Sequence, residues 1–500
     1  MGGSRLWNSA SCISASEMLY LLLIFFPITI ALSTFVLRRR TGLVIFIALG
    51  TVLTQLLIAT QIPVDDPTRL LGVTLILSAL SRTFLLVFLT LGGFAFVAAW
   101  HLPHGENFVP ITLLILAQVG TVLLLQDPFI TTLLLALTGL TAVLAIVDLP
   151  VGASTLVGTR AIAAALKYLV LMVVAAALMY VAFVLTDIFR PDELPGRISP
   201  ARFILALLSV SFALRLALVP FHTWLTDLVD FAEPLVAGVV ITLLNTTSLL
   251  VLMLVFQTFP TLLFESEVAL GMMRLGAIVS AVVAGALTLA PASLRHTLAY
   301  LVLYNGGMVF YGLASASPVG LAGAIFGALN QTVAVLLLFV SLGLLERPDG
   351  RAPSALRHDL LRRWPVAGAG LLAGGMALLG LPPLNGAVSH LLLYQAAAAK
   401  GWGELLPLLV ATLFAGVGLA RSVASHLLGP GEEAVATEPL LLGETELDRP
   451  AVRRLDPEPR SAAALTLLLL LICLGIGLYP QPILAMIDEA IRGLAFIRVL

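Results

Sequence analysis

Two ionisable residues lie deep inside long apolar stretches of this 500-residue sequence, each beside a proline-centred polar motif. Arg215 precedes the motif in "LRLALVPFHTWLTD", and His390 follows it in "LGLPPLNGAVSHLLLYQ". The unperturbed pKa of histidine is about 6.5, so His390 can take up and release a proton near neutral pH. Arginine stays charged, so Arg215 is either a fixed positive field near a channel or a structural cation paired with Asp227, Asp230 or Glu233.

Further polar side chains accompany the two motifs. His222 and Asp227 flank the first, and they either cap the unwound segment and the short helix after it or take part directly in proton transfer. Tyr394 lies one helical turn after His390 and could share its water network. His390 itself is either a titrating group or a hydrogen-bonded structural residue.

A polar stripe is predicted on the helix that follows the first motif. Thr242, Asn245 and Thr246 have the i, i+3, i+4 spacing of one α-helical face. Such a stripe can hold water or hydrogen-bond a neighbouring helix, and the second role is the commoner one. Gln331, in "ALNQTVAVLLLFVSLGLL", adds an amide that could line the same water path.

Composition places these residues in a polytopic membrane protein, because 60% of the chain is hydrophobic and only 11% is charged. The net charge of −1 gives no indication of nucleic-acid binding. Cys12 and Cys473 are the two cysteines, too few for an iron–sulfur cluster or a disulfide framework. No dinucleotide, flavin, metal or quinone motif is present, so we expect no cofactor and no redox chemistry on this chain.

Fourteen windows of about twenty apolar residues predict transmembrane helices, the seventh and twelfth being interrupted by the two motifs. Lipid offers backbone groups no hydrogen-bond partners, so a spanning helix unwinds only where protein or a water-filled cavity covers the break. The windows are 18–37, 42–62, 79–100, 108–125, 129–148, 162–187, 202–225, 234–258, 267–290, 296–314, 318–345, 366–398, 403–428 and 461–480.

The distribution of arginine predicts the orientation in the membrane. With fourteen spans, three arginine-rich connectors share one side, which the positive-inside rule makes cytoplasmic. Both chain termini are then outside, in the cytoplasmic membrane of a prokaryote. The connectors contain Arg38, Arg39 and Arg40; Arg347, Arg351, Arg357, Arg362 and Arg363; and Arg449, Arg453, Arg454 and Arg460.

The whole chain, 1–500, is predicted to form a single membrane domain with an internal duplication. Helices 1–3 occupy 18–100, a first five-helix repeat 108–258 and a second 267–428, with a mobile cytoplasmic loop at 429–460. Helix 14 and an amphipathic interfacial tail fill 461–500. Pro220 and Pro382 sit at similar places in the two repeats, as an inverted duplication requires.

Four segments resemble a known family: "FALRLALVPFHTWLTDLVDFAEPLVAGVV", "SLRHTLAYLVLYNGGMVFYGL", "ALNQTVAVLLLFVSLGLL" and "GLPPLNGAVSHLLLYQ". They are similar to the antiporter-like subunits of respiratory complex I, group 4 membrane-bound hydrogenases and Mrp-type sodium/proton antiporters. The resemblance implies a fourteen-helix subunit with two inverted repeats, which moves protons or Na⁺ beside sister subunits and is driven by redox chemistry in a peripheral arm.

The family also implies a path of buried ionisable residues, from which this sequence departs. Arg215 replaces a lysine on helix 7, and His390 replaces a lysine or glutamate on helix 12. The glutamate expected on helix 5, near 136–138, is absent. On helix 8 a lysine or histidine gives way to Thr242, Asn245 and Thr246, and on helix 11 the pattern "NHxxxK" becomes Asn330, Gln331 and Val335.

Two functions fit this sequence. The first is an active proton- or cation-translocating subunit, with Arg215 and His390 as its main elements and water paths through Thr242, Asn245 and Gln331. The second is a degenerate, non-pumping scaffold or coupling subunit that has lost most titratable channel residues. A stand-alone antiporter ranks third. Translocation requires continuous hydration past Arg215 and His390, whereas the scaffold predicts dry packing.

Overall fold

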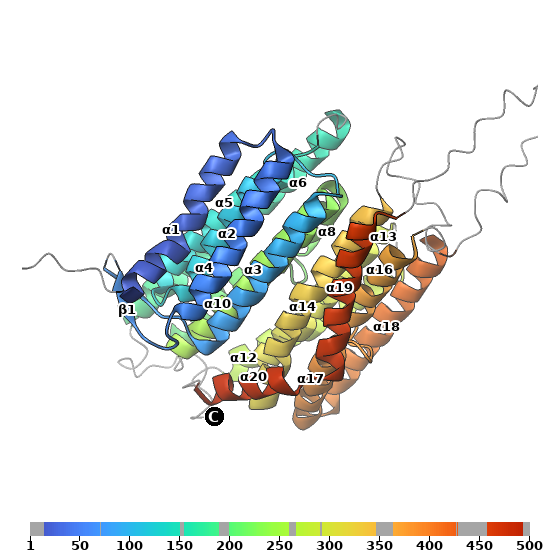
Figure 1. Ribbon diagram of the computed structural model, residues 1–500. Helices are drawn as coiled ribbons and strands as arrows, with labels where there is room; N and C mark the ends of the chain where they lie inside the picture. Colours follow the sequence, from blue (N-terminus) through green and yellow to red (C-terminus); the bar gives the residue numbers. More distant parts are fainter. Residues whose placement is uncertain are drawn as a thin grey trace, which may run out of the picture.

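Each of the fourteen predicted apolar windows forms helix in the computed structural model, which describes residues 15–70, 72–150, 155–189, 200–259, 267–290, 293–346, 364–426, 428 and 458–493. The helices lie side by side in one bundle (Figure 1). The first ten elements of helix are α1 Ala15–Val36, α2 Thr41–Gln61, α3 Ala79–Ala99, α4 Phe108–Leu124, α5 Pro128–Val147, α6 Thr155–Phe189, α7 Pro200–Arg215, α8 Thr223–Phe231, α9 Pro234–Val240 and α10 Thr246–Thr258. The remainder are α12 Glu267–Thr288, α13 Leu294–Ala314, α14 Pro318–Leu345, α16 Pro365–Leu378, α17 Gly386–Lys400, α18 Trp402–His426, α19 Arg460–Leu478 and α20 Gln481–Gly493.

The chain is a multi-pass membrane protein. Within the described ranges, eleven helices are long and apolar enough to cross a membrane, and α4 and α16 are shorter apolar helices. The predicted count of fourteen is therefore not matched one to one. It is reached only when α4 and the two interrupted helices, α7 with α8 and α16 with α17, are each counted as one crossing.

Two features were not expected from the sequence. Between α2 and α3 the chain forms a small antiparallel hairpin, β1 Thr68–Leu70 with β2 Val73–Leu75. Between α9 and α10 it forms a π-helical turn, Ile241–Asn245. A π turn widens the helix, so the α-helical spacing used to place Thr242, Asn245 and Thr246 on one face is interrupted there.

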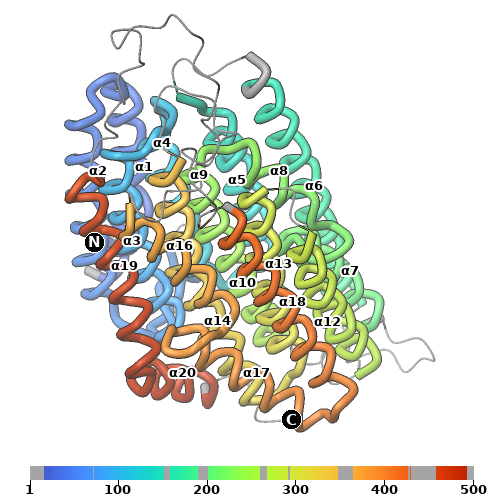
Figure 2. The backbone as a smooth tube through the Cα atoms, turned by 90° about the vertical axis from the view of Figure 1, so that its right-hand side faces the viewer, coloured from blue at the N-terminus to red at the C-terminus, as the bar shows by residue number. Residues whose placement is uncertain are grey.

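The helix packing repeats between two five-helix blocks, α4 to α10 and α12 to α18. In each, the third helix packs along both halves of the broken fourth, α6 on α7 and α8, and α14 on α16 and α17. Because five is odd, the second block enters the membrane from the opposite face and is inverted. Figure 2 shows α18 and α12 beside α13, and in the first block the corresponding helix α4 contacts both α5 and α10.

The centre of the bundle is α14, whose side chains are buried from Gly320 to Leu345. Small residues allow this close approach, because a Cβ at Gly238 of α9 would lie 2.8 Å from the Phe339 Cβ atom of α14. At one end of the bundle, α20 crosses the ends of α3 and α14 and buries Ile487 and Ile491 (Figure 1). The apolar face expected of the tail thus packs on the protein.

Several predicted segments lie outside the described residues. They include most of the loop at 429–460, the last seven residues of the tail, and Arg347, Arg351, Arg357, Arg362, Arg363, Arg449, Arg453 and Arg454.

Candidate functional site

The first helix break lies between α7 and α8 and is covered by protein. Ala217 has a φ of 59°, and the Leu218 backbone N–H donates to the Ala213 carbonyl at 2.9 Å. The Val219 N–H donates to Ser280 Oγ of α12 at 2.6 Å. Trp224 Nε1 of α8 donates to the Leu214 carbonyl of α7 at 2.9 Å, so one side chain joins the two halves. The backbone groups freed by the break thus find partners inside the bundle.

The second break, between α16 and α17, repeats this geometry. Gly380 has a φ of 73°, and the Leu381 N–H donates to the Met376 carbonyl at 3.0 Å. Both breaks contain a cis peptide bond, at Val219–Pro220 and at Pro382–Pro383. The left-handed residue precedes the cis proline by three positions in each case, at 217 and 220 and at 380 and 383. Pro220 therefore corresponds to Pro383, and not to Pro382 as the sequence suggested.

Arg215 ends α7 and is 2% exposed. Its Nε donates to Ser248 Oγ of α10 at 3.1 Å, and its Nη2 donates to the Leu135 carbonyl of α5 at 3.5 Å. Leu135 adjoins the 136–138 segment where the family's glutamate was expected, so Arg215 contacts a backbone carbonyl in this part of α5. Among the described residues, Nη1 has no partner.

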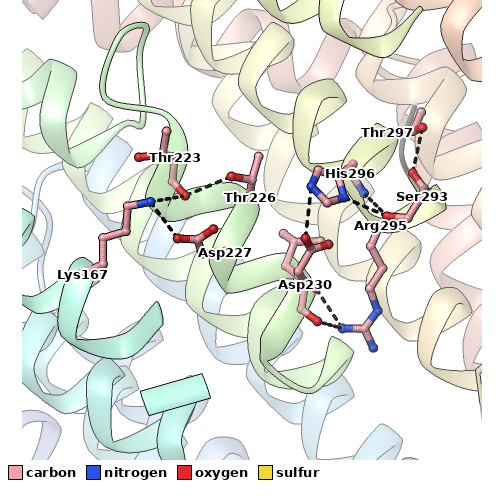
Figure 3. A network of polar contacts seen from close by, with 10 residues as sticks. Lys167, Thr223, Thr226, Asp227, Asp230, Ser293, Arg295, His296 and Thr297 are labelled. Atoms are coloured by element: carbon pink, nitrogen blue, oxygen red, sulfur yellow. Dashed lines mark hydrogen bonds and ion pairs between the residues drawn. The ribbon is translucent and has the colours of Figure 1, made fainter. Parts of the chain in front are cut away.

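The alternative in which Arg215 pairs with Asp227, Asp230 or Glu233 is wrong, because the described partners of its guanidinium are Ser248 and the Leu135 carbonyl. Asp227 Oδ2 instead lies 2.7 Å from Lys167 Nζ of α6, which also contacts the Thr223 carbonyl (Figure 3). Both side chains are roughly one-third exposed, at 39% and 34%.

The predicted caps are also absent. The His222 side chain makes no hydrogen bond to the first turn of α8 and instead interacts with the backbone of Pro220 in the unwound segment. Asp227 lies inside α8, where it points to Lys167 and not to the helix end (Figure 3).

A second charged network, which sequence reasoning missed, holds the other end of α8 (Figure 3). Arg295 of α13 donates from Nη1 to the carbonyls of Val229, Asp230 and Ala232 at 2.9–3.1 Å, which satisfies the open carbonyls of the helix end. Its Nε donates to Glu346 at 2.9 Å. The sequence did contain one signal for this network. Arg295 and His296 are adjacent basic residues in the first turn of α13, where the helix macrodipole disfavours positive charge.

The same network contains His296, whose Nε2 lies 3.1 Å from Asp230 Oδ2. Glu233, between α8 and α9, is close enough to feel the charges of Arg295 and Glu346, but burial is the stronger influence and raises the pKa of its carboxyl group. Acidic and basic groups therefore surround the end of α8 at the membrane face where α13 begins.

Amide and hydroxyl side chains occupy the space between the two breaks. Asn305 Nδ2 of α13 donates to Gln331 Oε1 of α14 at 3.0 Å, and Thr242 Oγ1 donates to the Thr332 carbonyl at 3.5 Å. Asn330 Nδ2 reaches the Ala377 carbonyl at the second break at 3.1 Å. In the described part of the chain, Thr246 Oγ1 and the Oδ1 atoms of Asn305 and Asn330 have no partner.

His390 lies against the second break and is 1% exposed. Its Nδ1 is 3.1 Å from the Gly386 carbonyl, and its Nε2 has no partner among the described residues. A Cβ at Gly380 would lie 2.3 Å from His390 Cγ, so the ring fills the space that this glycine leaves. The ring stacks on Tyr304 at 5.8 Å and meets Tyr394 edge-on at 6.0 Å between centroids.

Tyr394 joins His390 through ring contact, while its hydroxyl hydrogen-bonds Thr412 Oγ1 of α18 at 2.5 Å. Tyr304 Oη reaches the same oxygen at 2.6 Å. Sequence reasoning missed Tyr304 and Thr412, since a neutral residue inside an apolar window gives no signal until its helix partner is known.

The structure thus arranges the predicted residues as two centres joined by a polar row. Arg215 and His222 belong to the first break, with Asp227 beyond it, and His390 and Tyr394 belong to the second. Gln331, with Asn330 and Asn305, lies between them, and Thr242 contacts the same helix α14. Within the described ranges, no three His, Cys, Asp or Glu residues are placed to hold a metal ion.

A family model described as "NADH:quinone oxidoreductase/Mrp antiporter, TM" matches residues 131–415, more than half of the chain and including both broken helices. The chain belongs to this family. Curated members similar to it include NADH-quinone oxidoreductase subunit N 2 of Acidobacterium capsulatum, 29% identical over 43% of this chain and 45% of that protein. Subunit N 2 of Syntrophobacter fumaroxidans is 25% identical over 60% of each. The matches span about half the length of these relatives.

Two solved structures share the fold over nearly the whole chain. A chain of the Mrp complex from Dietzia sp. is 19% identical and superposes with a TM-score of 0.79, over 96% of this chain and 97% of its own. A chain of respiratory complex I from Thermus thermophilus is 22% identical and gives a TM-score of 0.71, over 94% and 99%. At these identities the likeness establishes the fold.

Proposed function

We propose that this chain is an antiporter-like subunit of a redox-driven, complex I-like or hydrogenase-like membrane complex, in which it translocates protons through two half-channels. The observation that supports this most directly is the set of buried polar atoms without protein partners at and between the two helix breaks. Buried polar groups in native proteins are nearly always hydrogen-bonded to protein or water. The Arg215 Nη1, Asn330 Oδ1 and His390 Nε2 atoms, which have no partner among the described residues, therefore suit a path for water and protons.

Arg215 and His390 have different roles in this proposal. Arg215 keeps its charge at any physiological pH, so it repels a proton that approaches the first break and sets the field there. His390 exchanges a proton through Nε2, while its Nδ1 is held by the Gly386 carbonyl. The amides of Asn305, Gln331 and Asn330 position water between the two centres.

A proton suits this site better than Na⁺. Sodium, as a hard cation, needs several oxygen ligands held together, and carboxylates are the strongest of them. The ring and hydroxyl groups around His390 and the guanidinium of Arg215 offer no such cage.

The partners and location follow from the family. Relatives bear the names of subunits of NADH-quinone oxidoreductase, and this chain has no cofactor motif, so we place it beside sister membrane subunits with the redox reaction in a peripheral arm. The arginine distribution supports an orientation in which both termini are outside a prokaryotic cytoplasmic membrane. By the same orientation the charged network around Arg295 and Asp230 faces the cytoplasm, where it would admit protons.

A scaffold role is the alternative, and the dense packing of the polar row favours it. Gln331 and Thr242 are each 1% exposed, and both bond to protein groups. The absence of the glutamate expected on helix 5, near 136–138, also favours the scaffold role.

Proton yield per electron separates the two functions. We would reconstitute the assembled complex in liposomes with His390→Ala or Arg215→Ala, using Arg69→Ala on the exposed hairpin as the control. Translocation predicts a reduced yield in both variants and an unchanged yield in the control. An unchanged yield in all three supports the scaffold.

A further inference from the structure

Three hydrogen-bonded pairs connect α13 with α18 across the membrane. Thr297 Oγ1 donates to Ser422 Oγ at 3.0 Å, Tyr304 Oη bonds Thr412 Oγ1 at 2.6 Å, and Tyr311 Oη donates to Glu404 Oε2 at 2.7 Å. The α13 members, at 297, 304 and 311, recur every seven residues, which is about two turns, and so they share one helix face. We call these pairs the inner, middle and outer pair.

The middle pair contacts His390. The Tyr304 ring stacks on the imidazole, and Tyr394, whose ring meets the imidazole edge-on, bonds the same Thr412 oxygen. Two phenols and one threonine hydroxyl therefore form a connected set beside the titrating residue of the second break. Thr412 Oγ1 also donates to the Leu408 carbonyl at 2.9 Å, so the three hydroxyls, which can both donate and accept, must reorient for a proton to pass along the set.

The outer pair carries charge and reaches the membrane face. Glu404 Oε1 accepts from Arg274 Nε of α12 at 3.1 Å, while Oε2 accepts from Tyr311. The Glu404 side chain is 25% exposed and that of Arg274 is 12% exposed, whereas Tyr311 is buried. Glu404 thus lies between solvent and a buried phenol, in the first turn of α18.

Glu404 and the charged network around α8 lie at opposite ends of the helix bundle. Since α13 begins beside Asp230 and ends beside Glu404, these two acids lie at opposite faces of the membrane. A proton that enters at the α8 network and leaves near Glu404 has crossed the bundle.

We infer that the middle and outer pairs form the exit path from His390, with Glu404 as the last proton acceptor before the face where α18 begins. This inference rests on the proposed translocation function. The middle and outer pairs are seven residues apart on α13, roughly 10 Å, so roughly three hydrogen bonds through transient water must join them. Met308 and Leu408, both buried, occupy the turns between and make this segment an apolar gate.

The test compares Glu404→Gln with Glu404→Asp and Thr297→Val in the assembled complex in liposomes. Glutamine keeps one of the two accepting oxygens, has an NH2 donor in place of the other, and cannot bind a proton. We expect Glu404→Gln to remove this subunit's share of the proton yield per electron, with assembly intact and with electron transfer restored by an uncoupler. Glu404→Asp should restore most of the yield, and Thr297→Val, which removes the inner pair, should leave it unchanged.

A readout independent of pumping is the infrared difference spectrum between resting and energised complex. A carboxyl protonation band that disappears in Glu404→Gln supports the exit, and a merely structural Glu404 predicts no such band. If His390→Ala reduces the yield while Glu404→Gln does not, the exit is wrong and the proposed function stands. If neither changes the yield, the proposed function itself fails. A loss in Glu404→Gln but not in His390→Ala would also overturn a path that starts at His390.

Discussion

Lys167 Nζ lies 2.7 Å from Asp227 Oδ2, so the acid that follows the first break is bound to α6 and leaves Arg215 without a carboxylate. Because both side chains of the pair are roughly one-third exposed, we expect a weak interaction. A double-mutant cycle of Lys167→Ala and Asp227→Ala should give a coupling of about 0.2–1 kcal/mol in the free energy of unfolding. Thermal or denaturant unfolding in mild detergent measures it, and a coupling well above this range would contradict the geometry.

The Arg295–Glu346 pair should be much stronger. These side chains are 19% and 8% exposed, and Arg295 also satisfies three carbonyls at the end of α8. Glu346→Ala should lower the free energy of unfolding by about 3–5 kcal/mol, because a buried charge loses its partner. Arg295→Lys should not restore this stability. The compact ammonium group of lysine lacks the several separated N–H donors with which the guanidinium reaches Glu346 and the carbonyls at the same time. Equal stability of Arg295→Lys and wild type would show that the charge alone matters.

Ser248 is expected to stabilise Arg215. Ser248→Ala removes the Oγ atom that accepts from Nε, and a hydrogen bond to a charged group contributes about 1.5–3 kcal/mol. Thr247→Val is the matched control, because the Thr247 hydroxyl bonds only the Leu243 carbonyl of its own helix. We expect a clearly larger loss of stability in Ser248→Ala than in the control. Similar losses would mean that the contact with Arg215 contributes nothing.

Gly380 should resist substitution for two separable reasons. Its φ of 73° disfavours any side chain, and a Cβ there would lie 2.3 Å from His390 Cγ. Gly72 has a φ of 83° and open space around it, so Gly72→Ala measures the backbone effect alone, about 1–2 kcal/mol. Gly380→Ala should lose more stability and also lower the proton yield by displacing the imidazole. Equal losses of stability in Gly380→Ala and Gly72→Ala would contradict the proposed contact between position 380 and the His390 ring.

Asp148 gives a pH dependence outside the membrane spans. It follows α5 and accepts hydrogen bonds from the Asn107 backbone N–H at 2.7 Å and from its Nδ2 at 2.9 Å. Burial outweighs these bonds and raises the pKa of the carboxyl group above its usual 3.8. The folded state therefore holds this proton more tightly than the unfolded state does. The stabilisation is complete below the unfolded pKa and is lost as pH rises through the folded one.

Asp148→Asn tests that sign, because an amide has no proton to lose. Unfolding midpoints of wild type and variant should be compared from pH 3.5 to 7, a range set by the usual carboxyl pKa. We expect the stability of wild type relative to the variant to fall as pH rises across the acid range. A relative stability that rises instead would mean that the hydrogen bonds from Asn107 outweigh burial.

The sequence could predict the helices and the two breaks because both rest on local signals. Long apolar windows must be helical in lipid, and the proline-centred motifs at Pro220 and Pro382 interrupt them. Arg215 and His390 were found because ionisable groups are rare at membrane depth.

The partners of these residues were predicted less well, because they depend on which helices pack together. Arg215 reaches α5 and α10 instead of the acids nearest to it in the chain. Tyr304, Thr412 and Glu404 come from helices whose sequences show no unusual pattern. The π turn before Thr246 has no periodicity of its own and could not be anticipated.

The central claim is that the two breaks border a water-filled proton path, and a high-resolution electron cryo-microscopy map of the assembled complex tests it most directly. We predict ordered water within hydrogen-bonding distance of His390 Nε2, Asn330 Oδ1 and Arg215 Nη1, continuing toward Thr412 and Glu404. A map of equal quality in which side chains close around both breaks, with no water near these atoms, would contradict the account and leave the scaffold function.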